Sequence, residues 1–238
     1  MNEPFALWVY LSTTPLLWLT VTLCAWVAAD RLAGASGRHP LANPVLISII
    51  AVSMVLWATR TPYGTYFEGA QFVHFLLGPA TVAIAVPLVR HRRSLRGNLL
   101  PLILALVVGS VMAIVSVIVI GRFFGLPREV LISMAPKSVT AGVAMGISQQ
   151  LGGQPSLTAV LVIFTGILGA LIVTPLMNAL RIRDYAARGF AVGLSSHGIG
   201  TARAFSVDPL AGTFAGIAMG LNAVLTAFLV PLAVSWWV

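Results

Sequence analysis

VLISMAPKSVTAGVAM, residues 130–145, is an apolar stretch that a proline and a lysine interrupt near its centre. The lysine, Lys137, is the only one among 238 residues. A cation at bilayer depth costs at least about 2.5–3.5 kcal/mol, and chains keep one where it lines a polar pathway or meets an anion. The stretch therefore predicts a membrane protein that handles a small anionic solute.

The composition supports a chain that lies mostly within a membrane. Hydrophobic residues make up 58% and charged residues 8%, with a mean hydropathy of +0.97, which excludes disordered and ordinary soluble proteins. The net charge is +8, but most arginines lie in short connections, so they indicate topology and lipid contact and not nucleic acid. One cysteine and no Cys/His cluster predict no disulfide, no metal and no cofactor.

The apolar residues fall into eight segments, each near the length of about 20 residues that a bilayer requires. We predict an all-α, polytopic integral membrane protein with discontinuous helices and one domain, 1–238. The expected segments are 5–29, 41–58, 67–89, 99–120, 130–151, 157–180, 189–205 and 210–237.

The chain repeats short patterns in the same order in two halves, approximately 5–121 and 128–238. Residues 11–15 (LSTTP) match 132–136 (ISMAP), and the segment that begins GPAT at Gly78 matches the one that begins GIGT at Gly198. Each match is weak alone, but the shared order predicts a duplication of four segments.

Orientation favours inverted over parallel repeats. The basic run at 90–96 is placed in the cytoplasm, and simple alternation would then leave Arg181, Arg183 and Arg188 outside. If segments one and five are broken or re-entrant, these arginines return to the cytoplasm and the halves become inverted copies, as in many secondary transporters.

The first interruption combines a helix breaker with polar groups. Pro136 should kink or stop a helix through 130–150, and the freed peptide groups need partners in protein or water. Lys137, Ser138 and Thr140 follow, so we expect the ammonium to pair with a solute carboxylate while the hydroxyls orient it. The alternative is a lysine that snorkels to the membrane surface.

The second interruption is SSHGIGTAR, residues 195–203. Serines cap helices and glycines permit an unwound approach, so a half-helix that begins near Gly198 would offer free amides to an anion. The candidate site residues here are Ser196, His197, Gly198, Gly200, Thr201 and Arg203.

Two of these residues have competing interpretations. His197 is either a proton-coupling group, because histidine titrates near neutral pH, or a histidine bonded to backbone within the bundle. Arg203 is either a second carboxylate clamp or an interfacial arginine beside Ser206 and Asp208.

The first half offers a matching break at Gly78-Pro79, with Thr81 as a hydroxyl donor across the pseudo-symmetric site. Asn222 in the last segment is a further site candidate, for which hydrogen bonding between helices is the simpler expectation. Catalytic motifs such as G-x-S-x-G or a P-loop are absent from the sequence, so an enzyme is not expected.

Several of these runs together resemble the LrgB/CidB family. They are APKSVT at 135–140, LGGQPSLTA at 151–159, SHGIGTAR at 196–203 and LGPATVAIAVP at 77–87. The resemblance covers nearly the whole chain and is specific in combination. It implies a bacterial cytoplasmic (inner) membrane protein that works with a small LrgA/CidA-type membrane subunit, and transporter precedent adds a homodimer.

The resemblance implies two functions. Plant relatives look like plastid glycolate/glycerate carriers, and some bacterial relatives are linked to pyruvate. The leading hypothesis is therefore a secondary carrier of small 2-hydroxy or 2-oxo monocarboxylates. The alternative is a holin- or antiholin-like protein that modulates murein hydrolase activity and lysis, and a third interpretation is an accessory subunit that is inert without its partner.

Overall fold

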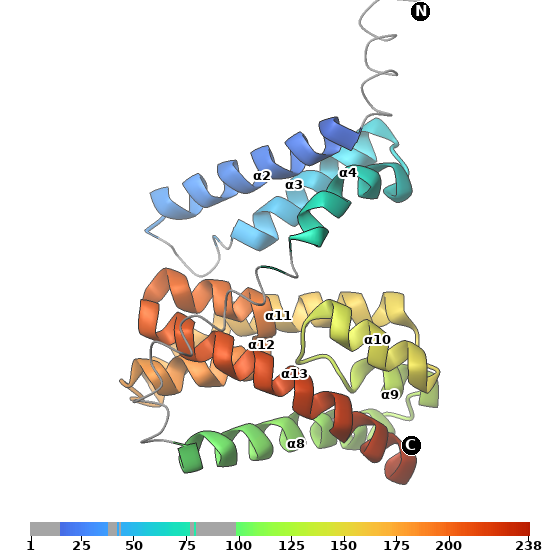
Figure 1. The fold of residues 1–238 in the computed structure, drawn as a ribbon, viewed down its shortest axis with the longest axis vertical. Helices are drawn as coiled ribbons and strands as arrows, with labels where there is room; N and C mark the ends of the chain where they lie inside the picture. Colours follow the sequence, from blue (N-terminus) through green and yellow to red (C-terminus); the bar gives the residue numbers. More distant parts are fainter. Residues whose placement is uncertain (1–14, 38–41, 43, 77–78, 80–98) are drawn as a thin grey trace, which may run out of the picture. The chain divides into compact units, whose positions relative to one another are not determined.

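The computed structural model describes residues 15–37, 42, 44–76, 79 and 99–238, and all its regular elements are helical. Four helices are long and apolar enough to cross a membrane: α2 (Pro15–Ala35), α8 (Leu99–Phe123), α11 (Pro155–Ala179) and α13 (Pro209–Trp237). The all-α, polytopic membrane protein is thereby confirmed. The chain divides into two compact units, Met1–Ala83 and Ile84–Val238 (Figure 1). The repeat halves and their inversion stay a prediction.

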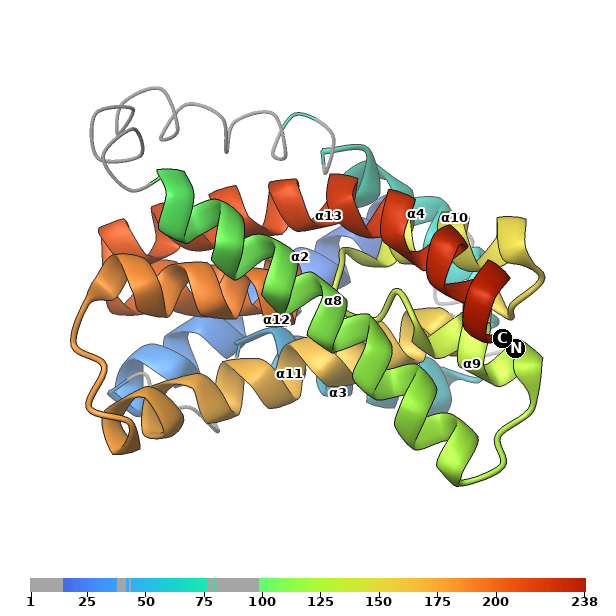
Figure 2. The same ribbon diagram turned by 90° about the horizontal axis from the view of Figure 1, so that it is seen from below.

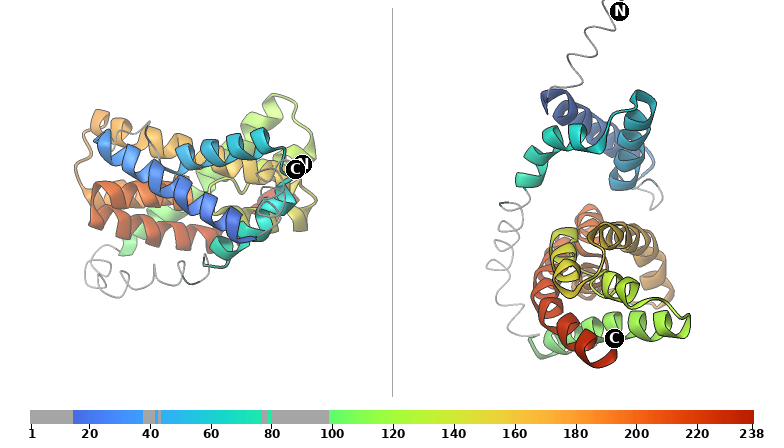
Figure 3. Two further views of the ribbon diagram at one scale, coloured as in Figure 1. Left: turned by 90° about the horizontal axis from the view of Figure 1, so that it is seen from above. Right: turned by 90° about the vertical axis from the view of Figure 1, so that its right-hand side faces the viewer.

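The first unit contains α2, α3 (Pro44–Thr59) and α4 (Tyr63–Phe75), with α2 in contact with both others (Figure 3). Trp18 is fully buried and meets the edge of Tyr66 at a centroid distance of 6.1 Å. At Gly69 a side chain would collide with the start of α2, so α4 and α2 approach closely there.

Two predicted segment ends differ in this unit. The first helix does not stop at residue 29 but continues through Asp30 and Arg31 to Ala35. The polar pair falls inside the last two turns, where side chains can reach out of the helix while its backbone bonds continue. In the third segment, α4 ends at Phe75, and most of the stretch expected to follow lies outside the described residues.

The second unit contains a helical hairpin, hairpin 1, built from α9 (Arg128–Met134) and α10 (Ala141–Leu151). Its arms lie side by side, because the Thr158 hydroxyl lies within hydrogen-bond distance of Ser133 O in α9 (3.0 Å) and Ser148 Oγ in α10 (2.8 Å). Ile132 and Ile147 share one apolar cluster. The fifth segment thus enters and returns to its own side.

A second hairpin, hairpin 2, lies within α12 (Tyr185–Val207). His197 interrupts the helix with φ 41° and ψ −134°, a backbone conformation that is uncommon for a residue with a side chain. Val192 before the break and Ala204 after it belong to one buried cluster. Twelve residues of continuous helix would separate them by about 18 Å, so the chain folds back at His197.

The two hairpins enter the unit from opposite ends (Figure 2). Along α11, Thr158 contacts hairpin 1 near its outer end, Val162 contacts both tips, and Val173 packs on the outer half of hairpin 2. The tips therefore meet midway along α11, framed by three helices that cross the whole unit, α8, α11 and α13.

This arrangement places the start of α8 beside the connection that follows α11. Leu102, near the start of α8, packs against the cluster that includes Ala186 of hairpin 2, so α8 begins at the end of the unit where α11 finishes and Arg181 follows. The basic run at 90–96, itself outside the described residues, immediately precedes α8 in sequence. Of the two segments predicted to return, the fifth does so, since Arg181 and the start of α8 lie at one end of the unit. The first is the continuous helix α2 from Pro15 onward, and the cytoplasmic placement of the basic residues stays a prediction.

Candidate functional site

The tip of hairpin 1 is the non-helical stretch 135–140, which the sequence predicted as a break. Pro136 and Ser138 are buried while Lys137 between them is half-buried. Thr140 begins α10 without a side-chain cap. Its hydroxyl is thus not committed to capping the helix.

The ammonium of Lys137 has no ion pair or hydrogen bond with any residue that the structure describes. The described carboxylates nearest in the chain lie at helix starts: Glu129 in the first turn of α9, and Asp184 and Asp208 as caps of α12 and α13. Both ionisable groups of the tips, Lys137 and His197, are therefore positive or neutral, a polarity that favours an anion.

The tip of hairpin 2 is centred on His197, which is 4% exposed. Its Nε2 lies 2.9 Å from the carbonyl oxygen of Val162 in α11; because a carbonyl only accepts, Nε2 carries the hydrogen. Thr201 Oγ1 donates to His197 O at 2.8 Å, across the break. The backbone-bonded interpretation of His197 is thus observed in this structure.

Two glycines of α11 make room for this tip. A side chain at Gly166 would collide with the His197 imidazole, and one at Gly169 would collide with Ser196. The Gly-x-x-Gly spacing puts both on one face of α11. Hairpin 2 therefore seats its tip in a shallow notch of a crossing helix.

Asn222 of α13 joins the two tips. Its Nδ2 donates to Leu194 O of hairpin 2 at 2.9 Å and to Ser138 O of hairpin 1 at 3.3 Å. Its Oδ1 accepts from Ser110 of α8 at 2.7 Å and from Thr226 at 3.1 Å. The expectation of hydrogen bonding between helices is confirmed.

The structure does not bring Arg203 to the tips. It lies on the returning arm of hairpin 2, where it borders a cavity of about 30 Å³ with Thr174 and Arg188, and its Nη1 lies 3.5 Å from Ser206 Oγ. The returning arm runs back toward the outer end, so six residues after His197 the chain has left the centre. This position agrees with the second interpretation of Arg203, an arginine beside Ser206 and away from the central site.

The remaining predicted site residues differ in their surroundings and in whether the structure describes them. Gly198 has open surroundings, with only Met219 Sδ at 3.9 Å from a would-be side chain, while Gly200 packs against Val192 within hairpin 2. Gly78 and Thr81 lie outside the described residues. Pro79 is described, but its neighbours on both sides are not.

Two features were not predicted from the sequence. One is that Ser110 and Thr226 are hydrogen-bond partners of Asn222, and the other is the notch at Gly166 and Gly169. The hydroxyl four residues after Asn222 and the paired glycines were visible as patterns. The pairing of Ser110 with Asn222 spans 112 residues and leaves no local signal.

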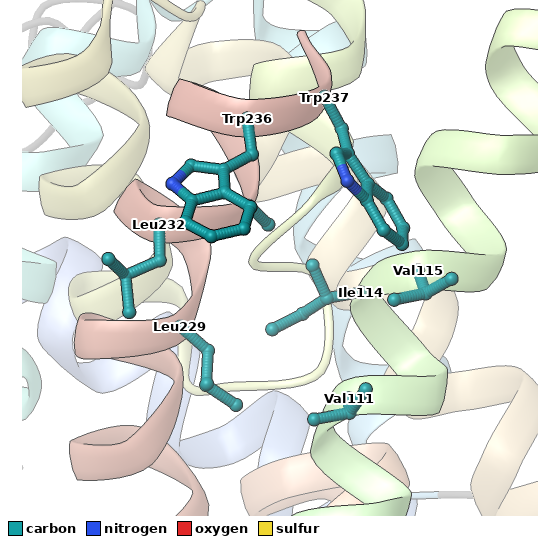
Figure 4. A pocket seen from close by; sticks show the side chains of 8 residues that line it. Val111, Ile114, Val115, Leu229, Leu232, Trp236 and Trp237 are labelled. Carbon is teal, nitrogen blue, oxygen red and sulfur yellow. The ribbon is translucent and has the colours of Figure 1, made fainter.

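An apolar groove lies between α8 and α13 (Figure 4), and its lining includes no residue of either hairpin tip. It has a volume of about 320 Å³ and is lined by Val111, Ile114, Leu229, Trp236 and Trp237 among others. Its walls carry almost no polar surface, so it cannot neutralise a carboxylate and is not the anion site.

Comparison with known proteins matches residues 22–236 to the LrgB-like family. YwbG of Bacillus subtilis is 35% identical over 82% of this chain and 86% of its own length. Holin-like protein CidB of Staphylococcus epidermidis is 31% identical over 83% and 86%, and that of Staphylococcus aureus is 29% identical over 92% and 95%. No solved structure matches.

Proposed function

The chain belongs to the LrgB-like family, and we propose that it is a secondary carrier of small monocarboxylates of the glycolate, glycerate and pyruvate class. The observation that carries this proposal is the meeting of two hairpin tips midway along α11, with Lys137 between Pro136 and Ser138. Broken helices that meet near mid-membrane are where many secondary transporters bind their solutes.

The charges of the tips support a solute with one carboxylate. Lys137 is the one lysine or arginine that the described tips hold, since Arg203 lies on the outer part of hairpin 2. One ammonium balances one carboxylate. The Ser138 and Thr140 hydroxyls follow Lys137 in the same tip and would hydrogen-bond the 2-hydroxy or 2-oxo oxygen of the solute.

The N-terminal starts of α10 and of the returning arm of hairpin 2 are a second feature that favours anion binding. α10 begins at Ala141 with Thr140 as an N-cap that makes no side-chain bond, and the returning arm begins after His197. First-turn amides and the positive end of a helix dipole attract anions. Both helix starts lie at the tips, so their fields add to that of Lys137.

Uptake into proteoliposomes tests the carrier. Labelled glycolate, glycerate and pyruvate should enter in a saturable way, and Lys137→Ala should abolish this uptake while Lys137→Arg retains part of it. Arg128→Ala is the matched control, because Arg128 is an exposed cation at the outer end of the same hairpin. Equal uptake by wild type and Lys137→Ala would remove the site.

The second candidate is a holin-like protein, and the comparisons favour it over the carrier. Relatives at 29–31% identity bear the name holin-like protein CidB, whereas the carrier draws its support from geometry. A holin-like protein of the bacterial cytoplasmic membrane would increase envelope permeability without selecting a solute and would modulate murein hydrolase activity and lysis.

The same proteoliposomes distinguish the two candidates. Non-selective leakage of an entrapped dye, dependent on protein density and unaffected by Lys137→Ala, would support the holin-like function and exclude the carrier. Uptake that appears only after co-reconstitution with a CidA/LrgA-type subunit would identify this chain as one part of a carrier. Crosslinking in the same vesicles measures whether it forms a homodimer.

A further inference from the structure

We propose that Asn222 is a positioning residue that holds the two hairpin tips in register through their peptide carbonyls, without touching the solute. The proposal deepens the function proposed above, because it concerns the same central site. Asn222 is 1% exposed, lies near the middle of α13, and contacts both hairpins from that single position.

The hydrogen-bonding capacity of the Asn222 side chain is fully used. An amide group offers two N–H donors and an oxygen with two lone pairs. The donors go to Ser138 O and Leu194 O, and the oxygen accepts from the Ser110 and Thr226 hydroxyls. A solute could bind this side chain only by displacing one of these partners.

The orientation of the amide follows from the chemistry of its neighbours. Ser138 O and Leu194 O are carbonyl oxygens, which can only accept, so the NH₂ group must face them. The Ser110 and Thr226 hydroxyls can donate, so they face the oxygen. A flipped amide would set its oxygen against two carbonyls, which fixes the assignment without reference to hydrogen positions.

The two carbonyls need Asn222 because each belongs to a break. Leu194 lies three residues before His197, whose non-helical conformation interrupts the helix within one turn of the Leu194 carbonyl. Ser138 lies in the non-helical tip before Thr140 begins α10. Unpaired carbonyls within a membrane are costly, so the two bonds to Asn222 satisfy carbonyls that the breaks expose.

The link also sets the geometry of the charged groups. Lys137 immediately precedes Ser138, and His197 follows Leu194 by three residues. A displacement of the Asn222 amide therefore moves the backbone that carries both ionisable groups of the tips. Its loss should loosen the site and weaken solute binding, without removing any group that touches the solute.

The test measures the distance between the hairpins directly. In a Cys24→Ser background, which leaves no other cysteine, spin labels at Val143 of hairpin 1 and Ser195 of hairpin 2 occupy exposed positions. Asn222→Asp keeps the size and an accepting oxygen but loses the NH₂ group. A protonated carboxyl offers one O–H donor and an ionised one offers none, so at least one of the two carbonyls loses its partner. We expect a narrow distance distribution in the parent and a broader one in Asn222→Asp.

Thr213→Val is the matched control. Thr213 is buried on the same helix, but among the described residues its hydroxyl bonds only to Pro209 O within α13, so this change should leave the distance distribution narrow. In uptake assays, Asn222→Asp should raise KM about tenfold, the scale set by lost buried hydrogen bonds, with a smaller effect on the maximal rate. Asn222→Gln, which retains both donors, should partly restore KM.

The outcomes separate this proposal from the carrier. An unchanged distance distribution in Asn222→Asp overturns it, even where KM rises, because Asn222 would then act on the solute itself. The spin-label distance measurement does not depend on transport, so it decides the proposal even if the protein transports no monocarboxylate. If Asn222→Asp does not fold, Asn222→Ser, which retains one donor, takes its place. Its distance distribution and its KM are then compared with those of the parent.

Discussion

Hairpins 1 and 2 reach the same place from opposite ends but are built differently. Hairpin 1 turns through six residues and is tied by hydroxyls: Gln154 N donates to Ser133 Oγ at 2.7 Å, and Thr158 lies between the arms. Hairpin 2 turns at His197 alone, and its contacts with α13 depend on small residues. Polar ties tolerate small adjustments, whereas close backbone packing does not, so hairpin 2 should be the less tolerant of change.

The two hairpins also differ in whether side chains cap the helices around them. Asp184 accepts from Ala187 N at the start of α12, and Asp208 accepts from Leu210 N and Ala211 N at the start of α13. The helices around hairpin 1, α9, α10 and α11, begin without side-chain caps. Hairpin 2 is thus fixed at its outer end and at its tip.

The largest effect is expected at the contact of hairpin 2 with α13. A Cβ at Gly193 would collide with the backbone of Ala215, which cannot yield, so Gly193→Val should cost more than about 3 kcal/mol. Thermal unfolding in detergent measures the loss. Gly146→Val in hairpin 1, where a Cβ meets nothing within 4 Å, is the matched control; equal losses would remove the proposed difference between the hairpins.

A smaller effect is expected at the notch in α11. Gly166→Ala places a methyl group against the His197 ring, which should break the bond to Val162 O and cost about 1–3 kcal/mol. The melting temperature should fall, and titration of the histidine, followed by NMR, should change. Gly220→Ala on α13, with open space around it, should change neither; a stable Gly166→Ala with an unaltered imidazole would contradict the notch.

The cap of α13 should contribute about 1 kcal/mol. Asp208→Ala removes the acceptor for two first-turn amides, and such replacements typically cost about 0.5–2 kcal/mol. Asp208→Asn retains the acceptor and should recover most of the loss in the same unfolding assay. If both variants melt alike, the aspartate acts through charge and not as a cap.

The smallest effect is expected in hairpin 1. Thr158→Val removes a hydroxyl that lies near Ser133 O, Ser148 Oγ and Gln154 O, and hydrogen bonds between membrane helices average about 0.6 kcal/mol. Thr213→Val, whose bond stays within its own helix, provides the baseline. A loss above that of Gly166→Ala would reverse the ranking of the two hairpins.

The breaks themselves could be predicted from sequence because their causes are local. Pro136 removes a helical donor and favours a kink or a stop, and the serines and glycines around His197 mark an interruption. The apolar pattern alone could not predict the path of the chain after each break, since an apolar half-helix that crosses looks the same as one that returns. Only the distribution of arginines favoured a return of the fifth segment, and no signal favoured the return at His197. Arg203 shows the consequence: it belongs to the same motif as His197, yet the fold-back carries it away from the tip.

The role of Asn222 divides in the same way. A polar residue in the last apolar segment predicted a bond between helices. Thr226 follows Asn222 by four residues, a spacing from which its bond to Asn222 could have been predicted. Ser110, Ser138 and Leu194 come from three other parts of the chain. Only the meeting of both hairpins at one depth makes them partners, and no local pattern encodes that meeting.

The fold-back of both hairpins has a consequence for topology mapping. Two returning segments remove two crossings, an even number, so the start of α8 and the end of α13 lie on the same faces as they would if all five segments crossed. A reporter fused to the C-terminus therefore gives one answer for both arrangements. Only the connections at residues 152–154 and 180–184 exchange sides, so single cysteines there, labelled with an impermeant maleimide from each face, are the informative positions.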